Sequence, residues 1–378
     1  MIKLLIADDS ALMRKLLGGI FSAEGDFDVR FARNGKEALA LAKSFEPDVV
    51  TLDVHMPEMD GLACLDRIMV ETPRPVVMLS AFTDEGAAAT FQALELGAID
   101  FMVKPAGPVS LGIDELGPRL VEKIRIAAAA RLRRSLRLRD RVRHRIEQAG
   151  SSARPQPGSR ARTRGSVAAA APRKRAAPSP ARGAAEPAGL VLIGASTGGP
   201  PAVESVVASL PGDFPWPIVV AQHLPASFTG TFAARLDALC ALRVVEVARP
   251  VPLRRGHVYI GRGDADIIVA PRASGPIALS APASADYAWH PSVERLVTSA
   301  LAVFPAAGLV GVLLTGMGSD GADAMTRLKA EGGRTIAESE ATAVVWGMPG
   351  ELVKNGGAGI VAPIGEIAAT ILDMMDGE

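Results

Sequence analysis

The sequence contains few of the residues that build disulfide frameworks, thiolate metal sites or membrane spans. Its only cysteines are Cys64 and Cys240, whose wide separation favours neither a disulfide framework nor a cysteine metal site. No uncharged apolar stretch reaches the ~18 residues that a membrane-spanning helix needs. The N-terminus lacks the charged n-region and the cleavage site of a signal peptide. We therefore expect a soluble, cytoplasmic protein without membrane insertion, kept in a reducing compartment.

Net charge is also absent, since 41 Lys and Arg residues balance 41 Asp and Glu residues, but the balance hides a basic segment. Residues 131–182 hold 16 basic side chains and only two acidic ones. The stretch 131–148 could continue a preceding helix, whereas the chain from Gly150 onward has no apolar periodicity and is typical of a disordered linker. Nucleic-acid binding is the alternative. No aromatic residue is interleaved with the arginines, which favours a solvated spacer and no specific nucleic-acid partner.

Short apolar runs alternate with helical patterns on both sides of this linker, which predicts an α/β fold. We expect two doubly wound, mainly parallel-sheet domains joined by the long Arg/Ala/Pro-rich linker. The predicted boundaries are 1–125, 126–187 and 188–378. In the last of these, the strand candidates are 190–193, 218–221, 244–247, 258–260, 267–269, 309–314, 335–337, 343–345 and 360–361.

A serine follows the first of these strand candidates on a glycine-flanked turn. Gly194-Ala-Ser196-Thr-Gly198 matches G-x-S-x-G, the pattern of a nucleophile elbow, and a helix is expected directly behind it. The backbone N–H groups at that helix end suit an oxyanion. A glycine-rich turn or a phosphate cradle is the competing interpretation, although the segment has no P-loop lysine.

A serine nucleophile needs a base, because its hydroxyl is too weakly acidic at neutral pH. His223 follows the next apolar strand and is expected at the same sheet edge as Ser196. His257 begins a strand and His290 opens a helix, so both are weaker candidates. His55 and His144 lie outside this part of the chain.

The orienting carboxylate is expected at the same edge as the serine and the imidazole. Asp320 lies just past the buried strand 309–314 at the start of a predicted helix, where it could also act as the N-cap. Asp323, one turn later, is the rival. The order Ser, His, Asp differs from the Ser, Asp, His order of α/β-hydrolases, which argues against that fold.

The first α/β segment places three acidic residues after its strands. Asp8 and Asp9 follow the first strand and Asp53 ends the third, so their carboxylates form a hard-oxygen site suited to Mg²⁺. Ser80 and Lys104 end the fourth and fifth strands, where a hydroxyl and an ammonium can both reach phosphate oxygens.

These residues, with the stretches 53–57 and 59–62, resemble a two-component receiver domain over residues 1 to about 122. The resemblance implies that Asp53 is the phosphoacceptor and that Asp8, Asp9 and Asp53 hold Mg²⁺, with the backbone carbonyl of His55 as a further ligand. It also makes Ser80, Lys104 and Phe101 the switch residues. His55 stands where Glu or another polar residue is expected, and a ligand role for its imidazole is the minor alternative.

The C-terminal segment resembles the catalytic domain of the chemotaxis protein-glutamate methylesterases through the motifs 193–200, 222–225, 315–321 and 346–349. The resemblance implies a catalytic triad and two residues beside it. One of these two, Met317, offers its backbone N–H as an oxyanion donor. Ser319 stands where Asn or Arg is usual, and 290–294 reads HPSVE where RPSVD is usual. We expect neither departure to touch the triad. The triad that the resemblance implies is Ser196, His223 and Asp320, and the implied neighbours are Thr197 and Met317.

Together the two resemblances imply an esterase controlled by phosphorylation. The expected reaction is hydrolysis of glutamate γ-methyl esters on methyl-accepting chemoreceptors, with receptor glutamine deamidation by the same chemistry and no cofactor for the esterase step. A chemotaxis histidine kinase would be the phosphodonor, and the unphosphorylated receiver would cover the catalytic face. The alternatives are a DNA-binding response regulator, which requires a helix-turn-helix reader, and a phosphate- or nucleotide-binding module.

Overall fold

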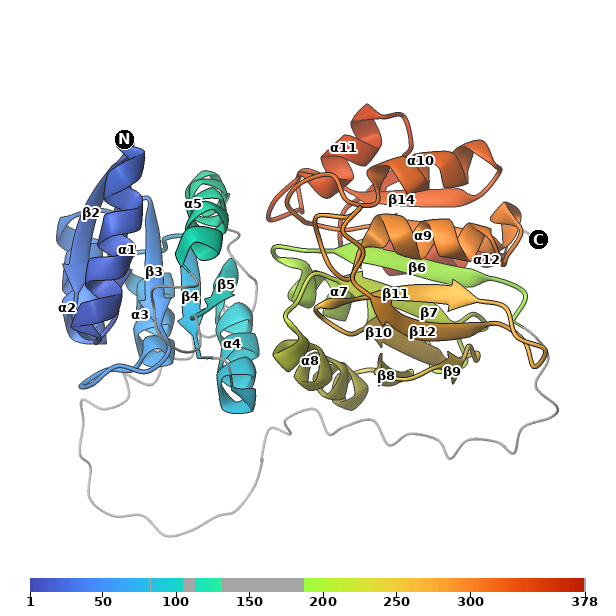
Figure 1. Ribbon diagram of the computed structural model, residues 1–378, viewed down its shortest axis with the longest axis horizontal. Coiled ribbons are helices and arrows are strands. Elements are labelled where there is room, and N and C mark those ends of the chain that lie inside the picture. The colour runs from blue at the N-terminus through green and yellow to red at the C-terminus, as the bar shows by residue number, and fades with distance from the viewer. Residues whose placement is uncertain (82, 105–112, 131–186, 377–378) are drawn as a thin grey trace, which may run out of the picture.

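The computed structural model describes residues 1–81, 83–104, 113–130 and 187–376. These residues form two parallel sheets, each covered by helices on both faces (Figure 1). The expected fold class is therefore confirmed. The predicted linker and the helical continuation from 131 to 148 lie outside the described residues. No helix in the described part of the chain is both long and apolar enough to cross a membrane.

The first sheet has five parallel strands, and alternate residues of each strand face opposite helical layers. Leu4 and Ile6 pack with one pair of helices, whereas Leu5 and Ala7 pack with the other three. In spatial order the strands are β2 (Phe27–Ala32), β1 (Ile2–Ala7), β3 (Val49–Asp53), β4 (Val76–Ser80) and β5 (Asp100–Val103). The first layer holds α1 (Ala11–Glu24) and α5 (Ile113–Ala129), and the second holds α2 (Gly35–Ser44), α3 (Gly61–Glu71) and α4 (Asp84–Leu96).

The second sheet has seven parallel strands, and its central strands are buried on both faces because helices cover them completely. In spatial order they are β15 (Ile360–Ala362), β14 (Arg334–Glu338), β13 (Leu309–Leu313), β6 (Leu190–Ala195), β7 (Ile218–Gln222), β10 (His257–Gly261) and β8 (Arg243–Val247). One face packs on α7 (Gly199–Val207), α8 (Ala226–Leu239) and α12 (Ile367–Asp376), and the other on α9 (Val293–Leu301), α10 (Ala322–Ala330) and α11 (Met348–Lys354).

Two details of this half differ from the sequence-based expectation. A small antiparallel sheet joins β11 (Ala265–Ala270), β12 (Ile277–Pro282) and β9 (Val251–Pro252) beside the main sheet. Strand β12 was not predicted because alanine, serine and proline give it little strand propensity. The strand expected at 343–345 is wrong: this stretch is a bend, and Val345 instead exchanges hydrogen bonds with the loop at Thr315 and Gly316.

The architecture also bears on the DNA-binding alternative. The described residues from 187 onward form a sheet-based unit rather than the small helical reader that a helix-turn-helix regulator carries. The sequence alternation therefore led to the right class of fold for this half of the chain.

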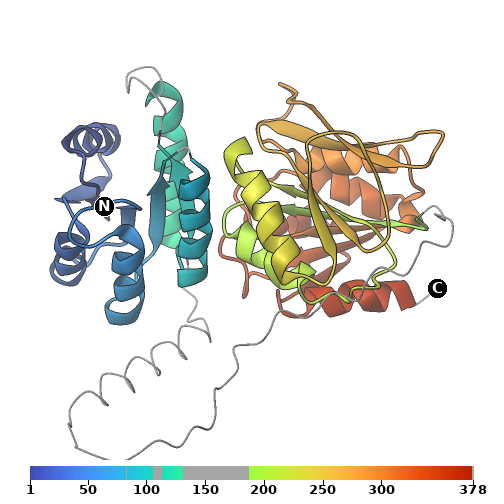
Figure 2. The ribbon, with the colours of Figure 1, turned by 90° about the horizontal axis from the view of Figure 1, so that it is seen from below.

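The two sheet units contact each other through α4 and β5 on one side and α7 and α8 on the other (Figure 2). The ring of Phe101 stacks on Phe228 with centroids 4.6 Å apart, and Phe91 stacks on Phe232 at 5.5 Å. Arg235 of α8 adds ion pairs to Glu204 of α7 and to Glu95 of α4. An aromatic cluster with a charged rim thus joins the N-terminal unit to the C-terminal one.

Candidate functional site

Ser196 lies at the carboxyl end of β6, on the turn that leads into α7. Its N–H donates to the Thr315 carbonyl (3.0 Å), and its own carbonyl accepts from the N–H of Gly199 (2.8 Å). Gly198 in this turn has a φ of 73°, and a Cβ there would lie 2.7 Å from Val344. Glycine is required at that position on both counts, because a side chain would meet backbone strain and a steric clash.

His223 follows β7, the strand next to β6, and its backbone N–H donates to the Ala195 carbonyl (3.0 Å). The imidazole Nε2 lies 2.9 Å from Asp320 Oδ2, and the side chain is only 8% exposed. Nδ1 is buried and has no hydrogen-bond partner within the described ranges. The Ser196 hydroxyl makes no hydrogen bond to the ring in that part of the chain, and such catalytic hydrogen bonds often form only when substrate is bound.

Asp320 lies beyond β13, as expected, but it does not cap the helix that follows it. That helix, α10, has Gly321 at its N-cap position. The Asp320 carboxylate instead accepts the N–H groups of Val293 (2.7 Å) and Glu294 (3.1 Å) at the start of α9, together with the Ser292 hydroxyl (3.0 Å). Burial works against the charge, but the hydrogen bonds from His223 and this helix end outweigh it and hold the pKa of Asp320 below its usual value.

The rival residues lie elsewhere. Asp323 is exposed and accepts a hydrogen bond from the Asn355 amide (3.0 Å). His257 lies at the amino end of β10, and its Nδ1 lies 2.9 Å from the Arg255 carbonyl. His290 binds Asp266 rather than Asp320, with 2.8 Å between Nδ1 and Oδ1. The departing motif at 290–294 was expected to stay clear of the triad, and this expectation is wrong because its members bind Asp320.

Gln222 is a residue of this site to which the sequence analysis assigned no role. Its side-chain amide donates to the carbonyl oxygens of Ser196 (3.0 Å) and His223 (3.2 Å) and so joins the two backbones. The residue is 1% exposed, and its Oε1 would be only 2.0 Å from a Cβ at Gly199. Its place as the last residue of a buried strand, directly before the candidate base, was the available signal.

The two predicted neighbours of the serine lie on different loops: Thr197 follows Ser196 directly, and Met317 follows β13. Thr197 is 5% exposed, and its hydroxyl donates to Asp100 Oδ2 of β5 (2.6 Å), which also accepts from Lys123 Nζ (2.7 Å). Met317 is buried in the loop after β13, whose Thr315 hydroxyl donates to the Thr197 carbonyl (2.9 Å). The residue after the serine is therefore in direct contact with the N-terminal unit.

The predicted acidic pocket lies at the carboxyl edge of the first sheet. Single carboxylate oxygens of Asp8, Asp9 and Asp53 lie within 4.8 Å of one another. Lys104 Nζ lies 2.8 Å from Asp8 Oδ2 and 2.8 Å from Asp53 Oδ2. Three carboxylates at this spacing, two of them buried, fit the hard-oxygen ligand set of Mg²⁺.

The charges of this pocket perturb one another. Burial raises the pKa of Asp53, and neighbouring Asp8 adds to the rise, while Lys104 partly opposes it. For Lys104, burial lowers the pKa, but the hydrogen bonds to the two carboxylates outweigh this and leave it raised. The single ammonium thus neutralises only part of the charge of the three carboxylates.

The remaining two switch candidates lie between this pocket and the other unit. The Ser80 hydroxyl donates to the Gly86 carbonyl (3.0 Å) at the start of α4. Phe101 is 6% exposed, because Phe228 of α8 covers its ring. A movement of Ser80 or Phe101 would therefore be felt by α4 or α8, the helices that join the two units.

Comparison with known proteins covers both units. Residues 4–112 match the response regulator receiver domain and residues 191–371 match the CheB methylesterase family. A protein-glutamate methylesterase/protein-glutamine glutaminase of Rhodopseudomonas palustris is 60% identical, with 99% of this chain and 98% of the relative covered. One from Rhodospirillum rubrum is 49% identical over 98% and 95%. The solved catalytic domain of Thermotoga maritima CheB is 33% identical, covers 49% of this chain and 98% of its own, and superposes with a TM-score of 0.48.

Proposed function

Because the chain belongs to the protein-glutamate methylesterase/protein-glutamine glutaminase family, we propose that it hydrolyses glutamate γ-methyl esters on methyl-accepting chemoreceptors and releases methanol. The observation that carries this proposal is the buried His223–Asp320 pair beside Ser196. An ester at this sheet edge would meet a hydroxyl, a base and backbone N–H groups.

In the proposed reaction, Ser196 Oγ attacks the ester carbonyl while His223 takes its proton. Nδ1 is the accepting atom, because Nε2 is held by Asp320. The N–H of Met317, and that of Thr197 after the nucleophile, are the proposed oxyanion donors. The tetrahedral intermediate collapses as the imidazolium protonates the departing methoxide, and water then cleaves the acyl-enzyme by the same route. With a glutamine side chain, ammonia leaves in place of methanol.

Gln222→Glu tests the backbone bridge in this mechanism. The substitution keeps the size of the side chain but replaces the donor amide with an oxygen that faces two carbonyl groups in a buried place. Leaving such groups unpaired costs about 1–3 kcal/mol, so kcat for methanol release should fall about 10-fold or more. Gln222→Met, which also lacks the donor, should behave similarly. Wild-type kcat in variants with unchanged thermal midpoints would contradict the role of Gln222.

We further propose that a phosphodonor, in the cell a chemotaxis histidine kinase, phosphorylates Asp53. Asp8, Asp9 and Asp53 would hold Mg²⁺, which when bound screens the negative charge of the incoming phosphoryl group. Lys104 would then pair with the phosphate oxygens, and the Ser80 hydroxyl would leave Gly86 to do the same. The phosphate adds roughly two negative charges beside three carboxylates and one ammonium, which favours this rearrangement.

The contact between the two units is proposed as the gate. The Thr197 hydroxyl, directly after the nucleophile, binds Asp100, and the neighbouring Phe101 stacks on α8. Substrate access to Ser196 would thus require this contact to loosen. On phosphorylation of Asp53, movement of Ser80 and Phe101 would loosen this contact between the two units.

Phe91→Ala tests the gate without any phosphodonor. Phe91 contacts Phe228 and Phe232, and aromatic pairs contribute about 0.5–1.5 kcal/mol each beyond burial. Basal methanol release by the full chain should therefore rise about 5-fold or more. Phe31→Ala is the control, because Phe31 is 44% exposed on β2, outside the contact. An unchanged basal rate for Phe91→Ala would argue that the contact does not limit access.

An active-site serine probe tests the nucleophile and the gate together. The full chain, treated with a phosphonate ester, should be labelled at Ser196, and labelling should accelerate when a small-molecule phosphodonor and Mg²⁺ are present. Labelling at another residue, or at a rate that phosphodonor leaves unchanged, would remove the nucleophile or the gate, respectively.

A further inference from the structure

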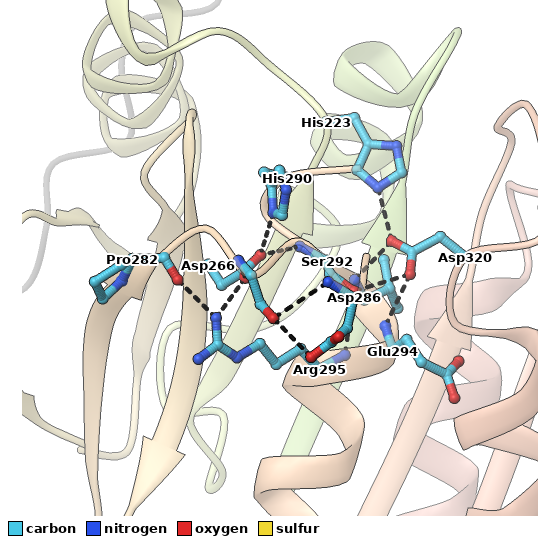
Figure 3. Close-up of polar contacts among 11 residues, drawn as sticks. His223, Asp266, Pro282, Asp286, His290, Ser292, Glu294, Arg295 and Asp320 are labelled. Atoms are coloured by element: carbon cyan, nitrogen blue, oxygen red, sulfur yellow. Dashed lines mark hydrogen bonds and ion pairs between the residues drawn. The ribbon is translucent and has the colours of Figure 1, made fainter. Parts of the chain in front are cut away.

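The segment between β12 and α9, residues 283–292, has no strand or helix of its own, yet it contacts the candidate acid–base pair (Figure 3). Its last residue, Ser292, donates its hydroxyl to Asp320 Oδ1 (3.0 Å). The indole of Trp289 stacks on the imidazole of His223, with ring centroids 5.7 Å apart and an interplanar angle of 12°. One irregular segment thus contacts both His223 and Asp320.

A second buried carboxylate fixes this segment from the opposite side. Asp266 of β11 is fully buried and accepts hydrogen bonds from the Ser292 N–H (2.8 Å) and the Ser284 N–H (3.2 Å), near the two ends of the segment. It also binds His290 Nδ1 (2.8 Å) and Arg295 Nη1 (2.6 Å). Figure 3 shows the two carboxylates, Asp266 and Asp320, on either side of Ser292.

The charge of Asp266 is well supported in this place. Burial opposes ionisation, but the hydrogen bonds from His290, Ser292 and Arg295 outweigh it and lower the pKa of Asp266. The mechanism proposed for the ester does not use this carboxylate. A buried, ionised aspartate that binds both ends of an irregular segment restricts where the segment can lie, because each bond would be lost in any other position.

We propose that Asp266 is a positioning residue for the His223–Asp320 pair. Its carboxylate holds the segment 283–292 so that Ser292 orients the Asp320 carboxylate and Trp289 fixes the plane of the His223 ring. The inference rests on the proposed Ser196–His223–Asp320 site and extends it to a residue of the small antiparallel sheet. Displacement of such a pair by even ~1 Å can cost about 100-fold in rate.

Asp266→Asn in the full chain is the test, measured as the rate of labelling by a phosphonate ester across pH. The substitution keeps the shape but removes the charge that binds His290 and Arg295, so labelling at neutral pH should slow about 10-fold or more. A less firmly held Asp320 stabilises the imidazolium that forms on His223 less. The acid limb of the rate profile should then move to lower pH, a change that a loss of folded protein alone would not cause.

The effect of the Asp266 charge must be distinguished from the effects of the other charged groups near the segment 283–292. His290 and Arg295 face Asp266, and Glu294 stands beside Asp320. Asp286→Asn is the matched control: it removes an exposed carboxylate of the same segment that binds only Ser284 among the described residues, and should leave rate and profile unchanged.

Two further variants keep the test decisive if Asp266→Asn is unstable. Trp289→Ala should slow labelling, and Trp289→Phe, which retains a ring to stack, should restore most of the rate. If both residues act through the segment, the combination of Asp266→Asn with Trp289→Ala should be no slower than the slower single variant, rather than show the product of both effects.

The outcomes separate the inference from the function it builds on. Suppose that Ser196→Ala and His223→Ala abolish labelling, but that a stably folded Asp266→Asn protein reacts at the wild-type rate and its acid limb does not move. The positioning role of Asp266 is then overturned, and the proposed function stands. Multiplicative effects of Asp266→Asn and Trp289→Ala would overturn it as well. If the Ser196→Ala protein is labelled like the wild type, the proposed nucleophile itself is wrong.

Discussion

Ser196→Ala should reduce methanol release from methylated receptor membranes by about 10,000-fold or more. Removing the nucleophile of a Ser-His-Asp triad leaves only the contributions of substrate binding and oxyanion stabilisation. In this chain the His223–Asp320 pair would remain intact, because neither residue depends on the serine side chain for its hydrogen bonds. The measurement is methanol release, or loss of methyl label from receptors, by full chain treated with phosphodonor.

The matched control for this experiment is Ser205→Ala on α7, the helix that begins directly behind the nucleophile. Ser205 is exposed, and its carbonyl rather than its hydroxyl takes part in the bond from Ser209. Its removal should leave the rate unchanged. Ser196→Ala should also keep the wild-type thermal midpoint, since the loss of one partly exposed hydroxyl creates no cavity. Methanol release within 10-fold of wild type from a folded Ser196→Ala protein would exclude Ser196 as the nucleophile.

Asp53→Asn should abolish the stimulation of methanol release by phosphodonors while leaving the basal rate measurable. The amide cannot accept a phosphoryl group, so the charge that would draw Lys104 and Ser80 onto a phosphate never forms. Asp53 is 4% exposed and paired with Lys104, so the substitution also alters a buried ion pair. The basal rate is therefore measured with the same protein, without phosphodonor.

Asp60→Asn is the control for the loss of a carboxylate near the same pocket. Asp60 is exposed and caps α3 through a hydrogen bond from the Ala63 N–H (2.7 Å), and asparagine caps helices equally well. Stimulation should survive in this variant. If phosphodonor still stimulated the Asp53→Asn protein as strongly as wild type, control of the esterase would have to reside in another residue.

Much of the arrangement could be predicted because strand ends are readable from the sequence. Continuous apolar runs end at Ala195, Gln222 and Leu313, and parallel strands bring their carboxyl ends to one edge. This rule placed the candidate residues of the second sheet at one edge, and it placed Asp8, Asp53 and Lys104 at one edge of the first sheet. The runs could not tell that β6 lies between β13 and β7, but any neighbouring order would have gathered these residues.

The predictions were wrong in irregular segments, where the sequence has neither helical nor strand periodicity. The bend at 343–345 has the apolar composition of a strand, but its groups bind the loop of Thr315 instead of a neighbouring strand. The cap expected from Asp320 serves α9 rather than α10, because the loop after β13 passes the start of α9. The helix end that a loop side chain reaches depends on which helix the loop passes in the folded protein. The local sequence carries no pattern that shows this.

The sequence by itself determined the two parallel sheets, their strand ends and the chemistry collected there, because burial imposes apolar runs and regular spacing on the residues concerned. Only the tertiary structure decided how Asp320 is held, that Gln222 bridges two backbones, and that Asp266 binds the segment carrying Trp289 and Ser292. Asp266 and Ser292 come from different elements, as do Ser292 and Asp320. Their contacts arise when irregular segments pack against a finished sheet, so they depend on the whole fold and not on local propensity.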